Sequence, residues 1–286
     1  MSVADVTSAL TPQQFADFST FIAQHLGIKM PPSKQVMLQS RLHRRLRELG
    51  LESFAEYHER FFRDEAAQAG EIEHLLNLAT TNKTDFFREP EHFDILSREV
   101  LPRWLHQPTG SVFRVWCAGC STGEEPYTLA ITLMEARARQ PFEFSILATD
   151  VSTRVLQHAR TAIYTEEQIA PIPQPLRTKY LLRSRDPEKR HYRIAPEVRA
   201  SVRFGHLNFL SSQYGLRELM DVVFFRNVMI YFDRPTQTDV VTKICHHLRP
   251  GGHLFIAHSE SLQGQPLPLR LLGPAFFQHD PSVLRT

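Results

Sequence analysis

Residues 112–129 read V-F-R-V-W-C-A-G-C-S-T-G-E-E-P-Y-T-L. An apolar run up to Trp116 breaks into small residues that include Gly119 and Gly123, and a helical pattern resumes after Pro126. Glycine lets a backbone take conformations closed to other residues and approach a ligand closely, and proline suits the first turn of a helix. The stretch therefore predicts a strand, a tight turn and a helix. In an open parallel sheet such a turn lies where ligands bind, beyond the carboxyl ends of the strands.

A hydrolase is one chemistry compatible with this loop. Residues 119–123 match G-x-S-x-G, the nucleophile elbow, with Ser121 as nucleophile and with Asp233 and His258 in the right chain order. A hydrolase elbow follows several strands, whereas roughly a hundred residues of helical pattern precede the first strand here. The context therefore disfavours a hydrolase.

A redox pair is a second possibility, because Cys117 and Cys120 form a C-x-x-C. The only other cysteine is Cys245, so the sequence lacks the second pair that a zinc site would need. Three cysteines also cannot build a disulfide framework, which favours a reducing compartment. Thiols among small residues in a turn commonly serve for their size, and we expect no metal site.

A nucleoside pocket is the third possibility, and it requires a carboxylate at the end of the second strand to bind ribose hydroxyls. Residues 144–150 read F-S-I-L-A-T-D and supply Asp150. Glu124 and Glu125 occupy the start of the helix and would repel a pyrophosphate. A phosphate-free cofactor with positive charge fits better, and S-adenosylmethionine, a sulfonium that carries an amino group, has this chemistry.

Length and composition are those of a folded protein with room for two domains. The chain has 286 residues, 42% of them hydrophobic and 22% charged, with a net charge of +2. No leader sequence is recognisable, and no apolar run approaches the roughly 20 residues of a membrane span. We expect a cytoplasmic protein without membrane insertion, and nothing in the sequence demands more than a monomer.

Residues 1–79 are predicted to form an all-α domain with four helices. On the second helix Arg41, Arg44 and Arg45 fall at helical spacing on one basic face, with only Glu48 to offset them within that helix. Such a face is commonly just solvated. It is also a candidate contact for an acidic partner.

Residues 80–110 are predicted to link the domains and to contribute to the cofactor site. Residues 80–88 read T-T-N-K-T-D-F-F-R, six polar residues followed by two aromatics and an arginine. Burial of the aromatics would fix where the polar groups point. The plainer interpretation is a capped helix start whose phenylalanines serve only packing.

Residues 111–286 alternate strand and helix, which predicts an α/β, doubly wound sheet. The predicted strands are Val112–Trp116, Phe144–Ala148, Val202–Phe204, Val222–Phe225 and Leu254–Ala257, with a last pair around Phe276 and Phe277. Residues of about 160–200 are predicted to be an insertion with a helix and a small antiparallel excursion. Basic residues outnumber acidic ones nine to three over residues 177–203. This patch lacks the interleaved aromatics of a base-stacking surface, so we expect an acidic protein partner and no nucleic acid.

A second dense stretch, D-V-V-F-F-R-N-V-M-I-Y-F-D, occupies residues 221–233. A buried strand ends and polar side chains follow at once, with Tyr231 one helical turn further on. We expect these groups to line the same crevice as Gly119 and Asp150.

Taken together, the motifs resemble the CheR family of chemotaxis receptor methyltransferases along nearly the whole chain. They are R-L-H-R-R-L at 41–46, T-T-N-K-T-D-F-F-R at 80–88, S-T-G-E-E-P-Y at 121–127, the strand ending in Asp150, R-N-V-M-I-Y-F at 226–232 and H-S-E at 258–260. The resemblance implies a Rossmann-like, S-adenosylmethionine-dependent methyltransferase domain with an inserted β-subdomain. It also implies methylation of glutamate side chains on chemoreceptor cytoplasmic domains, with S-adenosylhomocysteine as the other product.

The resemblance implies roles for individual residues as well. Those implied at the cofactor are Asn82, Thr84, Arg88, Gly119, Glu125, Asp150, Asn208, Phe209, Phe225 and Arg226. Arg88 and Tyr231 would lie nearest the transferred methyl group. The acidic methylation helices of a receptor would be bound by Arg41, Arg44 and Arg45. A free glutamate has a pKa of about 4.3, so the nucleophile is ionised at neutral pH and needs no general base.

Two departures from the family pattern and one competing class complete the expectations. The C-A-G-C that begins at Cys117 replaces small apolar residues, which leaves a thiol influence on activity open. The turn at residues 184–190 lacks the glycines with which some members grip a receptor tail, so we predict no strong tail tethering. The competing class is a non-catalytic module that binds S-adenosylmethionine and docks on receptors. The joint presence of Arg88, Asp150 and Tyr231 disfavours it.

Overall fold

The structure is a computed structural model that describes residues 9–107, 110–186 and 188–285. Residues 1–8 and 108–109 of the predicted ranges, and residue 187 of the insertion's turn, lie outside the described residues. The chain divides into two compact units, one that ends at Thr81 and includes residues 231–233, and one formed by residues 82–230 and the part from Arg234 onward. No described helix has the length and apolar character needed to cross a membrane.

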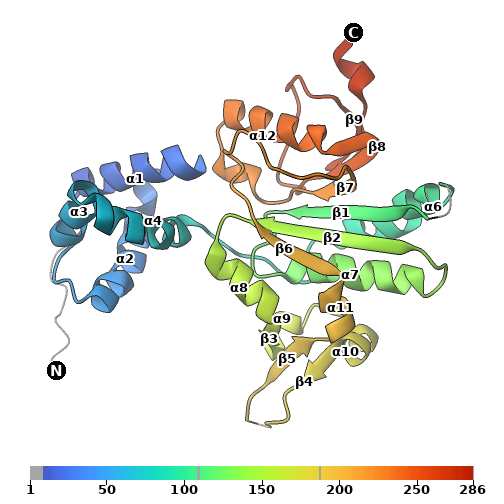
Figure 1. Cartoon of the computed structure of the whole chain (residues 1–286), viewed down its shortest axis with the longest axis horizontal. Helices are drawn as coiled ribbons and strands as arrows, with labels where there is room; N and C mark the ends of the chain where they lie inside the picture. The colour runs from blue at the N-terminus through green and yellow to red at the C-terminus, as the bar shows by residue number, and fades with distance from the viewer. Residues whose placement is uncertain (1–8, 108–109, 187, 286) are drawn as a thin grey trace. The chain divides into compact units, whose positions relative to one another are not determined.

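The N-terminal unit is helical, as the sequence predicts. Local signals set the bounds: Thr11 closes a capping box with Gln14, Gly50 ends a helix at a φ of 68°, and Ser53 caps the next helix. Phe18, Leu42 and other apolar side chains fill its core. Its elements are α1 (Pro12–Leu26), the 3-10 helix η1 (Pro32–Lys34), α2 (Gln35–Leu49), α3 (Phe54–Arg63) and α4 (Glu65–Ala79), and Figure 1 labels the four α-helices.

The C-terminal unit is built on a mixed sheet whose strand order, among the described residues, is β6-β2-β1-β7-β8-β10-β9. The first five strands are mutually parallel, and β10 runs antiparallel to β8 and β9. These strands are β1 (Val112–Ala118), β2 (Glu143–Asp150), β6 (Val202–His206), β7 (Met220–Phe224), β8 (Leu248–Phe255), β9 (Leu269–Gly273) and β10 (Phe276–His279). The predicted doubly wound α/β fold is confirmed.

The segments that connect the strands form helices, and these helices cover the sheet (Figure 1). Helices α7 (Glu124–Arg137) and α8 (Thr153–Thr161) pack against β2 and β6, and α12 (Arg234–His246) packs against β8. Before β1 the chain forms α5 (Glu91–Ile95), the π-helical turn η2 (Leu96–Val100) and α6 (Leu101–Trp104). Short 3-10 turns follow β7 and β10: η3 (Met229–Tyr231) and η4 (Pro281–Arg285).

Strand β8 differs most from its prediction, because it begins at Leu248 rather than Leu254 and ends at Phe255 rather than Ala257. Its pairing with β7 shifts register between Met220 and Val222. A bulge of this kind accommodates the R-P-G-G of residues 249–252, where glycine and proline argue against a strand. The prediction relied on the apolar run alone.

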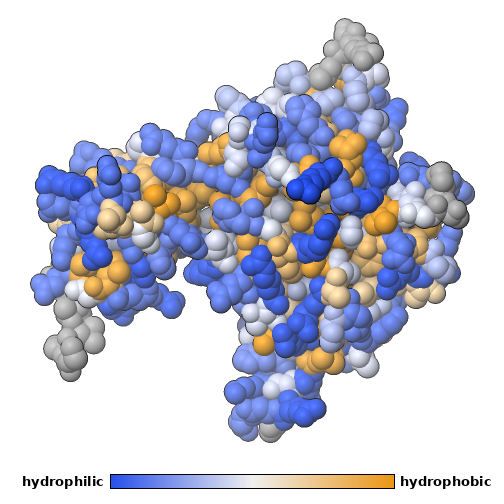
Figure 2. Space-filling view, in the orientation of Figure 1, coloured by the Kyte–Doolittle hydropathy of each residue, from blue (hydrophilic) through white to orange (hydrophobic). Residues whose placement is uncertain are grey.

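The insertion forms a separate antiparallel sheet of order β3-β5-β4, which projects below the main sheet in Figure 1. Hydrophilic side chains cover its tip in Figure 2. Its elements are β3 (Ile163–Thr165), α9 (Glu166–Ile169), α10 (Gln174–Tyr180), β4 (Leu181–Arg183), β5 (His191–Ile194) and α11 (Pro196–Ala200). The predicted antiparallel excursion is confirmed.

Candidate functional site

The candidate site follows from the direction of the strands. The carboxyl ends of β6, β2, β1 and β7 meet at one edge of the sheet because these strands are parallel. Strand β1 lies between β2 and β7, so the order of the strands reverses direction there. The structure thus brings Gly119, Asp150, Asn208 and Arg226 to the same edge, which is where α/β sheets bind their ligands.

The loop after β1 is held by its backbone. The amides of Gly119 and Cys120 both donate to the carbonyl oxygen of Thr149, at 2.8 and 2.9 Å. Gly119 has a φ of 89°, and a Cβ there would lie only 2.4 Å from Cγ2 of Val228. A side chain at position 119 would therefore push the loops after β1 and β7 apart.

Asp150 is fixed at the end of β2. Its Oδ2 accepts a hydrogen bond from the amide of Ser121 and its Oδ1 one from the amide of Ser152, each at 2.9 Å. The residue is 8% exposed, and this burial raises the pKa of its carboxyl although the amides favour the charged form. Each carboxylate oxygen accepts more than one hydrogen bond, so Asp150 can still receive ribose hydroxyls.

Arg226 is the centre of a buried ion network. Its Nη1 lies 3.0 Å from Oε2 of Glu125, and its Nη2 lies 3.2 Å from Oε2 of Glu89 and donates to the carbonyl of Arg88 at 2.5 Å. The guanidinium also lies over the ring of Phe93. Only 1% of the side chain is exposed. Arg226 therefore joins the segment before α5 to the start of α7, and its charge is already neutralised by protein carboxylates.

Arg88 is placed differently from Arg226. It is half-buried, and within the described residues its guanidinium makes one long hydrogen bond, from Nη1 to the carbonyl of Lys83 at 3.4 Å. Phe86 is buried and its ring packs against Tyr164, so the aromatic anchor expected in this segment exists. Residues 80–90 form no helix, which contradicts the plainer interpretation of a capped helix start. The anchored segment leaves Arg88 able to bind an anion.

Asn82 and Thr84 precede Arg88 and are half-buried. The carbonyl of Asn82 accepts a hydrogen bond from the hydroxyl of Ser121 at 2.9 Å, which ties this segment to the loop after β1. The Ser121 hydroxyl is thus engaged away from any histidine, and Asp233, which a hydrolase triad would need, pairs with Lys29 of the N-terminal unit. These contacts argue against the hydrolase.

The side of the site after β6 is aromatic. Asn208 turns the chain by accepting the amide of Leu210 on its Oδ1 at 2.9 Å. The rings of Phe209 and Phe225 meet edge to face at 5.1 Å. Phe225 has no exposed surface and packs against Phe209, and its expected contact with the cofactor stays a prediction.

The two cysteines of the loop are buried and form no disulfide. Cys117 Sγ donates to Oε1 of Glu125 at 3.1 Å. Burial raises the pKa of both thiols well above the ordinary value of cysteine, so both stay protonated and unreactive at neutral pH. The redox interpretation of Cys117 and Cys120 therefore loses its chemical basis.

Two carboxylates at this edge have structural contacts that the sequence did not predict. Glu260 of the H-S-E motif accepts the amides of Asn227 and Met229, at 3.1 and 2.9 Å, and so holds the loop after β7. Glu124 is 2% exposed, accepts the hydroxyl of Thr122 at 2.6 Å, and burial raises the pKa of its carboxyl to about 7. Both residues lie in motifs quoted from the sequence, and their presence in those motifs was the sequence signal that they matter.

A second cluster lies in the same unit, where no metal ligand or functional histidine was expected. Glu89, His92 and His258 offer ligand atoms that all lie within 4.8 Å of one another. His92 is completely buried, and neither of its ring nitrogens has a hydrogen-bond partner. Burial and the charge of Arg226 lower the pKa of His92 to about 3, so its ring is neutral.

Tyr231 belongs to the N-terminal unit. Its hydroxyl donates to the carbonyl of Thr81 at 3.3 Å, its own carbonyl accepts the amide of Lys29, and Nζ of Lys34 lies 5.5 Å from its ring. Its expected place beside the transferred methyl group stays a prediction.

The arginines of α2 have three different environments. Arg41 donates to two carbonyls at the end of α4, at 2.6 and 2.9 Å. Arg45 forms a bidentate ion pair with the buried Glu71, at 3.0 and 2.6 Å. Arg44 is 77% exposed and pairs with Glu48 one turn away. Two of the three side chains therefore stabilise the unit, and Arg44 is the one left at the surface.

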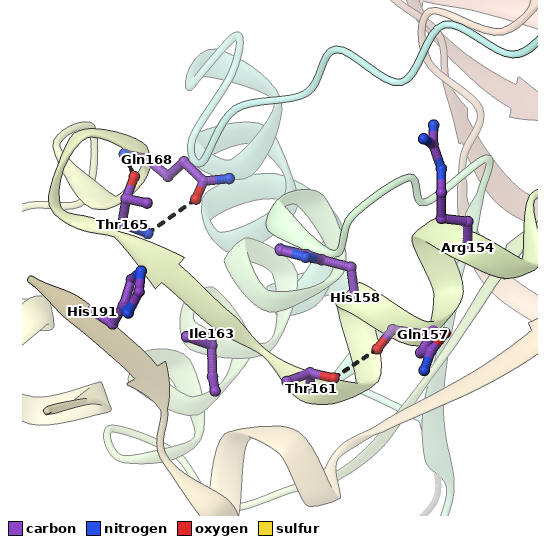
Figure 3. Close-up of a pocket in the computed structure, with 8 residues that line it drawn as sticks. All are labelled: Arg154, Gln157, His158, Thr161, Ile163, Thr165, Gln168 and His191. Atoms are coloured by element: carbon purple, nitrogen blue, oxygen red, sulfur yellow. Dashed lines mark hydrogen bonds between the residues drawn. The ribbon is translucent and has the colours of Figure 1, made fainter. Parts of the chain in front are cut away.

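The basic insertion is also more neutral than its composition suggests. Three of its cations pair with carboxylates, in Lys179–Glu135, Lys189–Asp186 and Arg190–Glu166, and Arg203 on the adjoining β6 pairs with Glu218. Beside it a hollow of about 550 Å³ lies between α8 and the strands β3 and β5, with Arg154, His158 and His191 among its lining side chains (Figure 3). Gln168 reaches from this hollow to Glu124, with 3.4 Å between Nε2 and Oε1.

Comparison with known proteins covers both units. Residues 13–80 match the family described as "CheR methyltransferase, all-alpha domain", and residues 82–274 match "CheR methyltransferase, SAM binding domain". The chain is 40% identical over 254 residues to "Chemotaxis protein methyltransferase 2" of Pseudomonas aeruginosa, which covers 88% of this chain and 87% of that protein. It is 37% identical over 271 residues to "Chemotaxis protein methyltransferase" of Salmonella typhimurium, covering 94% and 91%, and 38% identical over 254 residues to that of Escherichia coli, covering 88% and 86%.

Proposed function

Because the chain belongs to the CheR methyltransferase family and is an S-adenosylmethionine-dependent methyltransferase of chemotaxis, we propose that it methylates glutamate side chains on chemoreceptor cytoplasmic domains. The products are glutamate methyl esters and S-adenosylhomocysteine. Each ester removes a negative charge from the receptor, which is a means of adaptation in chemosensory signalling. The enzyme works in the cytoplasm as a monomer. Family membership confirms the resemblance and the cofactor expected from the sequence.

The different environments of Arg88 and Arg226 are the observation that supports an acidic acceptor. Arg226 is neutralised by Glu89 and Glu125, whereas Arg88, on the same segment as Glu89, keeps a guanidinium with one long hydrogen bond. A half-buried cation with spare donors favours binding of a carboxylate. The cofactor's own carboxylate and the acceptor glutamate are the two anions that this reaction brings together.

The donor set also fits the cofactor. Asp150 offers fixed carboxylate oxygens to a ribose, Asn208 and Phe209 would border the adenine, and Asn82 and Thr84 would hold the methionine end. When bound, S-adenosylmethionine supplies an electrophilic methyl group. The acceptor glutamate is already ionised at neutral pH, with a pKa of about 4.3, so the chain needs to align the reactants and exclude water rather than move a proton.

Receptor recognition is assigned chiefly to Arg44. The contacts of Arg41 and Arg45 occupy their guanidinium groups within the N-terminal unit, whereas Arg44 can exchange Glu48 for a carboxylate on an acidic methylation helix. Such an exposed contact adds specificity and weakens with salt. The glycine-free turn after β4 supports the proposal that no receptor tail is held tightly.

Transfer of labelled methyl groups to a receptor cytoplasmic fragment tests this function. We expect base-labile label on the fragment when it is incubated with the chain and labelled S-adenosylmethionine. Arg88→Ala should lose most of this transfer, and Arg98→Ala, which removes a 79% exposed arginine on η2, should keep it. Cofactor binding without any label on the fragment would favour a non-catalytic docking module instead.

A further inference from the structure

The cluster of Glu89, His92 and His258 is a site that methyl transfer does not use. We propose that it binds a divalent transition-metal ion of the Zn²⁺ class through Nδ1 or Nε2 of the two histidines and a carboxylate oxygen of Glu89. Glu89 directly precedes α5, His92 lies in its first turn, and His258 lies in the loop after β8, all within the C-terminal unit. Two imidazoles and one carboxylate form a ligand set typical of zinc with an open fourth position.

The geometry is close to what a metal requires. Zinc binds imidazole nitrogen at about 2.0–2.1 Å, which places tetrahedral ligand atoms about 3.3 Å apart. Nδ1 of His92 already lies 3.5 Å from Oε2 of Glu89, and the His92 and His258 rings are 4.7 Å apart between centroids. His258 is exposed, so its ring can turn to complete the set without disturbing the core.

His92 provides the observation that points to a ligand. Its ring is completely buried, and in the described structure neither nitrogen has a hydrogen-bond partner. Buried polar groups are nearly always paired, and an unpaired one is costly. A metal ion bound to one ring nitrogen would give that nitrogen a partner. Water cannot do so, because solvent has no access to the ring.

Arg226 is the competitor for the same ligand. Its Nη2 lies 3.2 Å from Oε2 of Glu89, the oxygen that also lies nearest His92. A cation bound there would displace the guanidinium from Glu89 and leave Arg226 held by Glu125. Metal binding should therefore disturb the cofactor site and inhibit methyl transfer, a consequence that rests on the proposed function.

Zinc binding can be measured without reference to activity. Untagged protein, stripped of metal, is titrated with Zn²⁺ in competition with a chromophoric chelator. We expect one site, with an affinity at least about 10-fold weaker in His258→Ala, since even an outer-sphere partner contributes that much. His246→Ala removes another exposed histidine of the same unit and should bind like the wild type. Co²⁺ bound in place of Zn²⁺ should show a spectrum without thiolate charge transfer, which excludes the cysteines as ligands.

The outcomes separate the two proposals. No zinc bound by the wild type, or equal binding by His258→Ala, would overturn the site. Zinc that binds at His258 but leaves methyl transfer unchanged would overturn the link to Arg226 alone. Absence of methyl transfer in metal-free protein would count against the proposed function and leave the zinc titration intact.

Discussion

The strand edge of the C-terminal unit and the surface of α2 in the N-terminal unit use arginine in opposite ways. At the strand edge the side chain of Arg226 is 1% exposed and is shared by Glu89 and Glu125. On α2 the side chain of Arg44 is 77% exposed and pairs with Glu48 in its own helix. A buried, multiply bound charge fixes the shape of a site, whereas an exposed one is worth little to stability and remains available to a partner.

Arg45 shows that the position of an arginine in the sequence does not decide whether it stabilises the fold or stays available to a partner. It follows Arg44 directly, yet its side chain is 16% exposed and bound to Glu71 of another helix. Its environment resembles that of Arg226 more than that of its neighbour. The identity and burial of the partner carboxylate, rather than the charge pattern, separate a structural arginine from a binding one.

Arg226→Met should have the largest effect, because it leaves two carboxylates without their cation. Breaking a buried ion pair costs about 3–5 kcal/mol of unfolding free energy. Denaturant unfolding of the variant measures this loss, and calorimetry should show that S-adenosylhomocysteine no longer binds. Arg63→Met removes a 79% exposed arginine paired with Glu59 and should change neither quantity. Equal losses in both variants would break the distinction between buried and exposed arginines.

Tyr231→Phe should lower turnover while cofactor affinity holds. A hydrogen bond to a charged group contributes about 1.5–3 kcal/mol, which corresponds to roughly 10- to 100-fold in rate. Steady-state transfer to a receptor fragment and calorimetry with S-adenosylhomocysteine measure the two quantities. Tyr192→Phe, on the half-buried tyrosine of β5, serves as the control. Unchanged turnover in Tyr231→Phe would remove the tyrosine from the reaction.

Asp150→Asn should weaken the cofactor without unfolding the chain. The amide keeps one acceptor oxygen where the carboxylate supplied two, so a ribose hydroxyl loses a charged partner. We expect about a 10- to 100-fold loss of S-adenosylhomocysteine affinity by calorimetry. Asp94→Asn, on a carboxylate that is 62% exposed, is the matched control. Wild-type affinity in Asp150→Asn would contradict the ribose assignment.

Glu124→Gln should flatten the pH dependence of stability. Burial raises the folded-state pKa of this carboxyl to about 7, above its unfolded value of about 4.3. Its contribution is therefore fully present below pH of about 4 and is lost as the pH rises to about 7, by roughly 3–4 kcal/mol. Denaturant unfolding across this range measures the loss in the wild type. The control Glu143→Gln, at the exposed start of β2, should keep the pH profile of the wild type. If Glu124→Gln also kept that profile, the buried carboxyl of Glu124 would not be protonated.

Much of the strand edge was predictable from the sequence because its signals are local. One apolar run ends just before Gly119 and a second ends in Asp150, so the sequence places both residues at the ends of strands. Because the two strands are parallel, these ends lie at the same edge of the sheet. The partners of the charges were not predictable in this way. Arg45 meets Glu71 from another helix, and Glu89 meets the amide of His258, which is 169 residues away in sequence. The metal cluster depends on that long-range contact, and no spacing rule indicates it.

Arg44→Ala should have the smallest effect. Exposed ion pairs contribute about 0.2–1 kcal/mol, so receptor-fragment affinity should fall only a few-fold and the difference should shrink at high salt. Arg63→Ala tests an equally exposed arginine of the same unit. A similar, salt-dependent loss in both variants would show that net charge, rather than the α2 surface, attracts the receptor.

The most direct test of the proposed function is tandem mass spectrometry of a receptor cytoplasmic fragment after incubation with the chain and S-adenosylmethionine. We predict an added methyl group on glutamate side chains, removed by mild base, and absent when those glutamates are replaced by alanine. Methyl groups found only on lysine, cysteine or backbone termini, or a fragment left unmodified by protein that binds S-adenosylhomocysteine, would contradict the assignment of glutamate as the acceptor.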